Sequence, residues 1–135
     1  MGKIILSTTF VSSWFLYIVG GWELLMTVLV VFMSIDIFTG LIKAAIKRQL
    51  NSKIGYKGFL KKATIMLVII LANWLDALTT TDVPAFKTIA LYFYIGMEGL
   101  SIIENLHQIG VPIPRVISKY MASLVEEDND ESKKE

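Results

Sequence analysis

Three long runs of apolar residues occur along the chain, and short polar segments separate them. The runs extend from about Trp22 to Ile42, from about Leu60 to Leu78 and from about Pro84 to Leu106. A bilayer core about 30 Å thick requires roughly 20 mainly apolar helical residues, and each run comes near that length. Thr81 and Asp82 are candidates for the N-cap of the third helix. The pattern predicts an all-α protein with three transmembrane helices.

A further apolar segment lies at the start of the chain, in residues 4–19. It is short for a span, and it contains the hydroxyl residues Ser7, Thr8, Thr9, Ser12 and Ser13. Such hydroxyls can donate to carbonyls of their own helix, so a complete span and a helix at the membrane interface both fit this composition. We expect residues 1–21 to form an N-terminal apolar helix and residues 22–114 to form the transmembrane domain.

The segment that follows the third run begins with Pro112 and Pro114, which prevent a continuous helix. Apolar residues then recur at helical spacing between residues 115 and 125, which predicts a short amphipathic helix on the cytoplasmic face. Residues 126–135 contain no apolar side chain and many charges. We expect that last segment to be a disordered, solvated tail.

The composition agrees with a membrane protein. Hydrophobic residues make up 54% of the chain, the net charge is only +1, and the mean hydropathy is +0.59, whereas soluble domains of this size seldom carry so much apolar surface. The chain has no cysteine and a single histidine, and it lacks the short motifs of phosphate-binding loops and nucleophile elbows. We therefore expect no enzymatic activity, no catalytic residue, no metal site, no cofactor and no nucleic-acid partner.

The segment between the first two runs, residues 43–62, contains seven cations and no acid. An excess of Lys and Arg in a short connection predicts that it lies in the cytoplasm. With three spans, the C-terminus is then cytoplasmic, and the N-terminus is outside unless residues 4–19 also span. Binding of anionic lipid, at roughly 1 kcal/mol per basic residue, is a second hypothesis for this segment. The cations of the predicted basic loop are Lys43, Lys47, Arg48, Lys53, Lys57, Lys61 and Lys62.

Polar side chains also occur inside the apolar runs, where an ionisable group usually has a function or a partner. They fall on one face of each predicted helix: Asp36, Thr39 and Gly40 in the first, Asn73 and Asp76 in the second, and Glu98, Ser101, Glu104 and Asn105 in the third. One interpretation is hydrogen bonding between helices that holds a bundle together. A second is the lining of a water-filled opening in a homo-oligomer, and a third is a proton relay through Glu98 and Glu104.

Five short motifs occur in order along the chain: DIFTG (36–40), SKIGYKGFLKK (52–62), LDAL (75–78), EGLSIIEN (98–105) and GVPIP (110–114). Together they resemble the toxin-secretion and phage-lysis holin family over about residues 20–120. One position departs from the family pattern. An asparagine commonly precedes the first glutamate of the fourth motif, and this chain has Met97 there.

The resemblance implies a multi-pass protein of the bacterial cytoplasmic membrane that is encoded by a phage or prophage. It implies homo-oligomers that open lesions at a set time. An endolysin or a large toxin then leaves the cell through these lesions and does not need to contact the oligomer directly. It implies no catalytic duty for the matching residues. The alternative function is a small proton- or ion-coupled channel or transporter in which Glu98 is the titrating residue.

Overall fold

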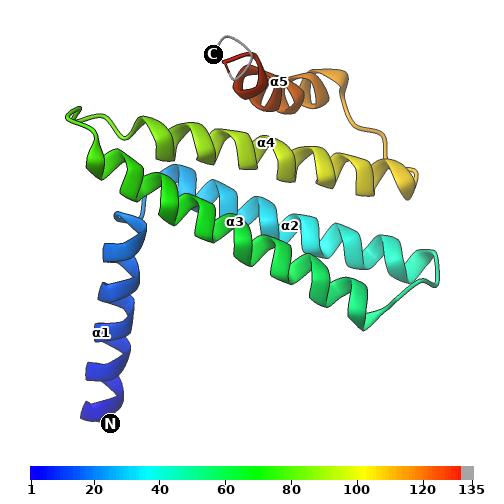
Figure 1. Ribbon diagram of the computed structural model, residues 1–135. Coiled ribbons are helices and arrows are strands. Elements are labelled where there is room, and N and C mark those ends of the chain that lie inside the picture. The colour runs from blue at the N-terminus through cyan, green and yellow to red at the C-terminus, as the bar shows by residue number, and fades with distance from the viewer. Residues whose placement is uncertain (132–135) are drawn as a thin grey trace.

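The computed structural model describes residues 1–131, which form five α-helices and no β-strand. Helices α2, α3 and α4 run side by side as a bundle, α1 extends away from one end of that bundle, and α5 lies across α4 (Figure 1). The all-α prediction is confirmed, and α1 to α4 are each long and apolar enough to cross a membrane. The helices are α1 (Gly2–Val19), α2 (Leu24–Ile46), α3 (Ser52–Leu78), α4 (Ala85–Gln108) and α5 (Arg115–Glu131).

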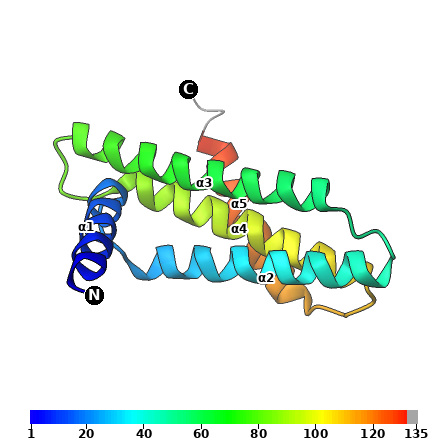
Figure 2. The ribbon, with the colours of Figure 1, turned by 90° about the horizontal axis from the view of Figure 1, so that it is seen from below.

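Helix α4 occupies the centre of the fold, because it packs against α2, α3 and α5. Figure 2 shows α2 and α3 on either side of it. The apolar core lies where the three bundle helices meet, and it consists of Met26, Leu29 and Met33 from α2, Ile65 and Ile69 from α3, Leu91 and Ile95 from α4, together with Val19. The polar residues of α4 are therefore presented to two different neighbouring helices.

Helix α3 begins at Ser52, well before the apolar run from which it was predicted. Asn51 is its N-cap, and the Asn51 side chain accepts a hydrogen bond from the Lys53 backbone N–H at 2.9 Å. Because α2 continues to Ile46, only residues 47–51 form a connection. The predicted basic loop, residues 43–62, is thus replaced by two helix ends and a short turn. Hydropathy marks only the part of a helix that matches the bilayer core, and lysine itself favours helix.

Helix α1 satisfies its own hydroxyl groups, as expected. The side chains of Ser7, Thr8, Thr9 and Ser12 donate to carbonyls three or four residues earlier. Gly20 ends the helix with a left-handed φ of 79°, which glycine adopts without strain. The end of α1 contacts α3, where Asn73 lies 3.4 Å from the Ile18 carbonyl oxygen and the rings of Tyr17 and Trp74 meet edge to face.

Helix α5 is longer than predicted and folds back along α4. It continues to Glu131, so residues 126–131 are helical although they belong to the segment expected to be disordered; residues 132–135 lie outside the described residues. Adding a residue to an existing helix costs far less than starting one, and this favours extension beyond the apolar part. Rather than leaving the bundle, α5 packs against the side of α4 that faces away from α3 (Figure 1).

Two glycines of α4 allow this close approach. A Cβ atom at Gly96 would lie 2.9 Å from the Leu124 Cβ, and one at Gly99 would lie 2.5 Å from the Met121 sulfur. Both distances are too short for a real side chain, so a larger residue at Gly96 would require a small shift of α5, and one at Gly99 would require the flexible Met121 side chain to move. Small residues have the same role between membrane helices, where they let backbones come close together.

The docking of α5 on α4 predicts a disulfide bond between cysteines placed at Gly96 and Leu124. The two Cβ positions are close enough to need only a small shift to reach the usual Cβ separation of about 3.8 Å. We expect the double variant Gly96→Cys, Leu124→Cys to form an intramolecular disulfide in membranes, detected by mass spectrometry after mild oxidation. The natural chain has no cysteine, so no other pairing competes.

The matched control is the pair Gly96→Cys, Val116→Cys, because Val116 is 79% exposed near the other end of α5. That pair should stay reduced. Equal oxidation of the two pairs, or none in the first, would show that α5 leaves α4 when the protein is in a bilayer.

Candidate functional site

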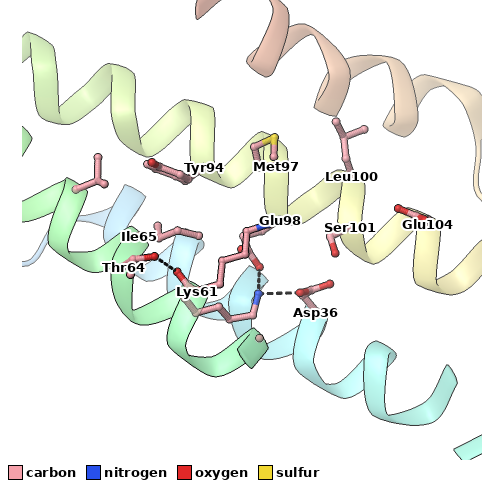
Figure 3. Close-up of a pocket in the computed structure, with 13 residues that line it drawn as sticks. Asp36, Lys61, Thr64, Ile65, Tyr94, Met97, Glu98, Leu100, Ser101 and Glu104 are labelled. Atoms are coloured by element: carbon pink, nitrogen blue, oxygen red, sulfur yellow. Dashed lines mark hydrogen bonds and ion pairs between the residues drawn. The ribbon is translucent and has the colours of Figure 1, made fainter. Parts of the chain in front are cut away.

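Three charged side chains from three helices meet inside the bundle. The Lys62 Nζ atom of α3 lies 2.7 Å from the Asp36 Oδ2 atom of α2, and it also contacts the carboxylate of Glu98 from α4. Figure 3 labels Asp36 and Glu98, and dashed lines mark these two ion pairs. The side chains of Lys62, Asp36 and Glu98 are only 12%, 14% and 8% exposed. We call these three residues the ion cluster. It joins all three helices of the bundle at one level.

The position of the ion cluster along the helices places it within the thickness of a bilayer. At 1.5 Å per residue, Asp36, Lys62 and Glu98 lie about 18, 24 and 20 Å from the helix ends at Leu24, Leu78 and Ala85. A hydrocarbon core about 30 Å thick that starts near those ends contains all three residues. An unpaired charge at such a depth is costly, and mutual pairing reduces that cost.

Two buried polar residues extend the ion cluster. The Asn105 Nδ2 atom donates to the Asp36 Oδ1 atom at 3.0 Å and to the Thr39 hydroxyl at 3.2 Å, while the Thr39 hydroxyl donates to the Ile35 carbonyl. Asp36 therefore accepts from Lys62 through one oxygen and from Asn105 through the other. Gly40 lies beside them, because a Cβ there would be 3.7 Å from Asn105. These contacts bring Asp36, Thr39, Gly40, Glu98 and Asn105 together within the bundle.

The ion cluster borders a cavity of about 570 Å³ between α3 and α4. Tyr94, Ser101 and Glu104 line the same cavity, and Figure 3 shows them along α4. Two carboxylates face one ammonium group, and the cavity has room for water beside them. Within residues 1–131 no group of three or more His, Asp or Glu is arranged to hold a metal ion. The chemistry offered by the site is charge pairing and hydrogen bonding.

Asp76 and Asn73 do not take part in the ion cluster. The two carboxylate oxygens of Asp76 accept from the backbone N–H groups of Phe86 and Lys87, each at 2.8 Å. This carboxylate satisfies two free donors at the start of α4 and interacts favourably with the helix dipole. The structure thus gives the capping role to Asp76 instead of Thr81 or Asp82, since the N-cap position is Pro84 and has no side-chain acceptor.

The predicted polar face of α4 divides into an inner and an outer part. Glu98 and Asn105 are buried, whereas Glu104 is exposed and accepts from Gln108 at 3.0 Å. Ser101 is half-buried at the wall of the cavity. A face as wide as a third of the helix circumference covers both a packed edge and an open edge, and the contacts with α2 and α3 decide which residues are inside.

Two lysines were not predicted to have structural roles. Lys62 was predicted only as a cation of the basic loop, for orientation or lipid binding, and Lys87 is 3% exposed with its Nζ atom 3.3 Å from Glu23 Oε1. That pair is close enough for charge attraction but lacks hydrogen-bond geometry. A signal was present in the spacing: Lys62 continues the buried face formed by Ile65 and Ile69, at i, i+3 and i+7.

The amino-acid sequence matches the bacteriophage holin family over residues 13–126. The chain belongs to the bacteriophage holin family. It is 46% identical over 98 residues to a probable holin of Bacillus phage phi105, which covers 72% of this chain and 70% of that protein. It is also 37% identical over 124 residues to an uncharacterized protein of Clostridium perfringens, with 92% of each covered. No solved structure matches.

A further relative is an uncharacterized protein of Bacillus subtilis, 40% identical over 118 residues that cover 87% of this chain and 81% of that protein. The holin-family match includes every residue of the ion cluster and most of α5, whereas residues 1–12 of α1 lie outside it. The bundle and the ion cluster therefore belong to the part of the chain that carries the family relationship.

The ion cluster predicts a large effect of removing its cation. Lys62→Met leaves two buried carboxylates that face each other without a counter-charge, and breaking a buried pair in this way costs about 3–5 kcal/mol. We expect a marked fall in the thermal unfolding midpoint of the detergent-solubilised protein, followed by circular dichroism.

The control is Lys61→Met, because Lys61 is the adjacent lysine and is exposed. Adding Asp36→Asn and Glu98→Gln to Lys62→Met should restore most of the lost stability, since no uncompensated charge is left. Equal unfolding midpoints for Lys62→Met and Lys61→Met would contradict the role assigned to the ion cluster.

Proposed function

We propose that this holin-family protein forms homo-oligomers in the bacterial cytoplasmic membrane and opens lesions at a set time. An endolysin, or in another setting a toxin, then crosses the membrane without binding to it directly. The observation that carries the proposal is the ion cluster, because it holds charged groups inside membrane spans while satisfying them within a single chain.

Pairing of charges within one chain supports a closed state, in which the protein accumulates in the membrane without permeabilising it. Each charged residue near the middle of a span costs about 2.5–3.5 kcal/mol to insert, and large apolar neighbours return about 0.3–0.6 kcal/mol each. Lys62 and Asn105 supply donors to Asp36, so this carboxylate has no need of water or of a second copy. A chain in this state exposes apolar side chains to lipid and keeps its paired charges inside.

The same groups support an open state. A shift of α3 relative to α4 would separate Lys62 from Glu98 and present both charges to water or to a neighbouring chain. The bundle would then exist in equilibrium between a closed and an open arrangement.

Helix α5 also supports an open state. This helix packs against α4, and its exposed charged residues, such as Lys119 and Glu126, need water, which the lumen of an oligomeric lesion would supply.

The orientation belongs to the proposal as well. The α2–α3 end of the bundle carries six of the seven cations of residues 43–62, and under the positive-inside rule this excess supports a cytoplasmic position for that end. The end of α4 and the start of α5 are then cytoplasmic too. Helix α1 points away from the bundle instead of running along it, and we infer that it lies at the outer interface (Figure 1).

A proton- or ion-coupled channel is the second candidate, and the cavity beside Glu98 is the observation that favours it. Such a protein would conduct small solutes selectively and would not release folded proteins. No catalytic step is proposed for either function.

Lesion formation predicts release of a folded cytoplasmic protein. We expect induced expression with a co-expressed endolysin to cause a sudden fall in culture turbidity, because the lesion admits the endolysin to the cell wall. Without endolysin, a folded fluorescent reporter should leak from spheroplasts made from the induced cells. Loss of potassium ions without any reporter release would overturn the lesion proposal in favour of the ion-coupled channel.

The proposed orientation predicts which cysteines are labelled from outside. We expect Thr80→Cys and Gly2→Cys to react with a membrane-impermeant maleimide in intact cells, and Ser52→Cys to react only after permeabilisation. Labelling is measured by a shift in electrophoretic mobility in the cysteine-free background. Reaction of Ser52→Cys in intact cells would reverse the orientation, and protection of Gly2→Cys alone would show that α1 spans.

A further inference from the structure

A groove between α2 and α3 lies near the end of the bundle that carries the cations. Its volume is about 520 Å³, and α4 forms its floor through Ser101, Asn105 and Gln108. The turn at residues 49–51 closes one end, and the Lys62–Asp36 pair closes the other. Figure 2 shows α2 and α3 on either side of α4.

The lining of the groove is amphipathic. Its walls carry apolar side chains, namely Ile37 and Leu41 from α2 and Ile54 and Phe59 from α3. Lys43 and Lys47 lie at the mouth, in and just after the last turn of α2. The one carboxylate in the lining, Asp36, is already paired with Lys62.

The two lysines at the mouth are available to an anion. The Lys43 side chain has no hydrogen bond or ion pair with any residue in the described part of the chain, and Lys47 donates only to the neutral amide of Gln108, at 3.1 Å. A ligand that fits must therefore supply negative charge at the mouth and a hydrocarbon chain along the walls. Basic pockets between membrane helices at the cytoplasmic side bind the head groups of acidic phospholipids by this combination.

The depth of the groove agrees with such a ligand. It extends from the ion cluster, which lies within the hydrocarbon core, to the end of α2, which reaches about 35 Å from Leu24 and so passes the edge of that core. A lipid of one leaflet has its head group and the first part of its acyl chain at this depth.

We propose that the α2–α3 groove binds one anionic phospholipid, with its phosphate at Lys43 and Lys47 and an acyl chain between α2 and α3. The inference does not rest on lesion formation, because binding to the closed bundle is measured without lysis. Its failure would leave the proposed function untouched, and failure of the proposed function would leave the groove in place.

The test is a titration of the full-length protein in detergent with palmitoyl-oleoyl phosphatidylglycerol, and with the phosphatidylcholine of the same chains, followed by native mass spectrometry. We expect one phosphatidylglycerol to be retained per chain, and phosphatidylcholine to be retained much less. In the double variant Lys43→Gln, Lys47→Gln the affinity for phosphatidylglycerol should fall roughly 30-fold, since each basic residue contributes about a factor of five.

The double variant Lys53→Gln, Lys57→Gln is the matched control. It removes the same charge from the same end of the bundle, but neither lysine lines the groove. Equal loss of phosphatidylglycerol in the two double variants would overturn the proposal, because general attraction between a basic surface and acidic lipid would then account for the binding.

A second variant fills the groove without changing any charge. Gly58 lines the groove, and a Cβ atom there has no neighbour within 4 Å, so the Cβ atom of a Gly58→Leu variant meets no clash. We expect this variant to fold with an unchanged thermal midpoint and to lose the bound phosphatidylglycerol. Retention of the lipid would overturn the proposal. If the variant retains the lipid and also loses self-association, the occupant of the groove is a second copy of the chain.

Discussion

One lysine ammonium group between two carboxylates holds the three bundle helices at a fixed level. In a bilayer no hydrophobic force draws helices together, because lipid tails are as apolar as the side chains they would replace. Close packing and polar contacts must provide the specificity instead. Lys62 meets Asp36 and Glu98 at once, so it ties α3 to both α2 and α4, and Asn105 strengthens the α2–α4 side of the same contact. The register of all three helices depends on this arrangement.

The start of α4 depends on different polar contacts. Asp76 binds the first backbone N–H groups of α4 and thereby fixes the turn between α3 and α4. Lys87 reaches across to Glu23 and so locates the start of α2. Helix α4 is thus positioned at two levels, and the segment between them carries Gly96 on the face that receives α5. A helix held in this way can present one face to the bundle and a second face to a movable partner.

Much of the architecture was predictable from the apolar runs, since a length near 20 residues has few solutions other than a membrane helix. The partners of the polar residues were not. Lys62 lies at the end of an apolar run, where a cation can either set the orientation or pair with an acid inside the bundle. The contact with Asp36, which comes from a distant segment, shows that it pairs inside the bundle. Asp76 was likewise predicted only as part of a polar face, because its position in the sequence does not show that the first N–H groups of α4 lie beside it. The early start of α3 was missed because hydropathy is silent about a helix beyond the hydrocarbon core.

The cations of residues 43–62 therefore differ in their surroundings, and a count of charges in this segment does not distinguish them. Lys62 is turned inward and neutralised, so it contributes little to the field at the membrane surface, while the other six cations remain at or near the α2–α3 end. Orientation depends on the number of surface cations and is insensitive to the loss of one. Among them, Lys62 joins all three bundle helices through two carboxylates, whereas Lys47 contacts only the neutral amide of Gln108. A change at Lys62 consequently alters the stability of the bundle without altering its orientation, which makes helix packing and topology separable properties of this chain.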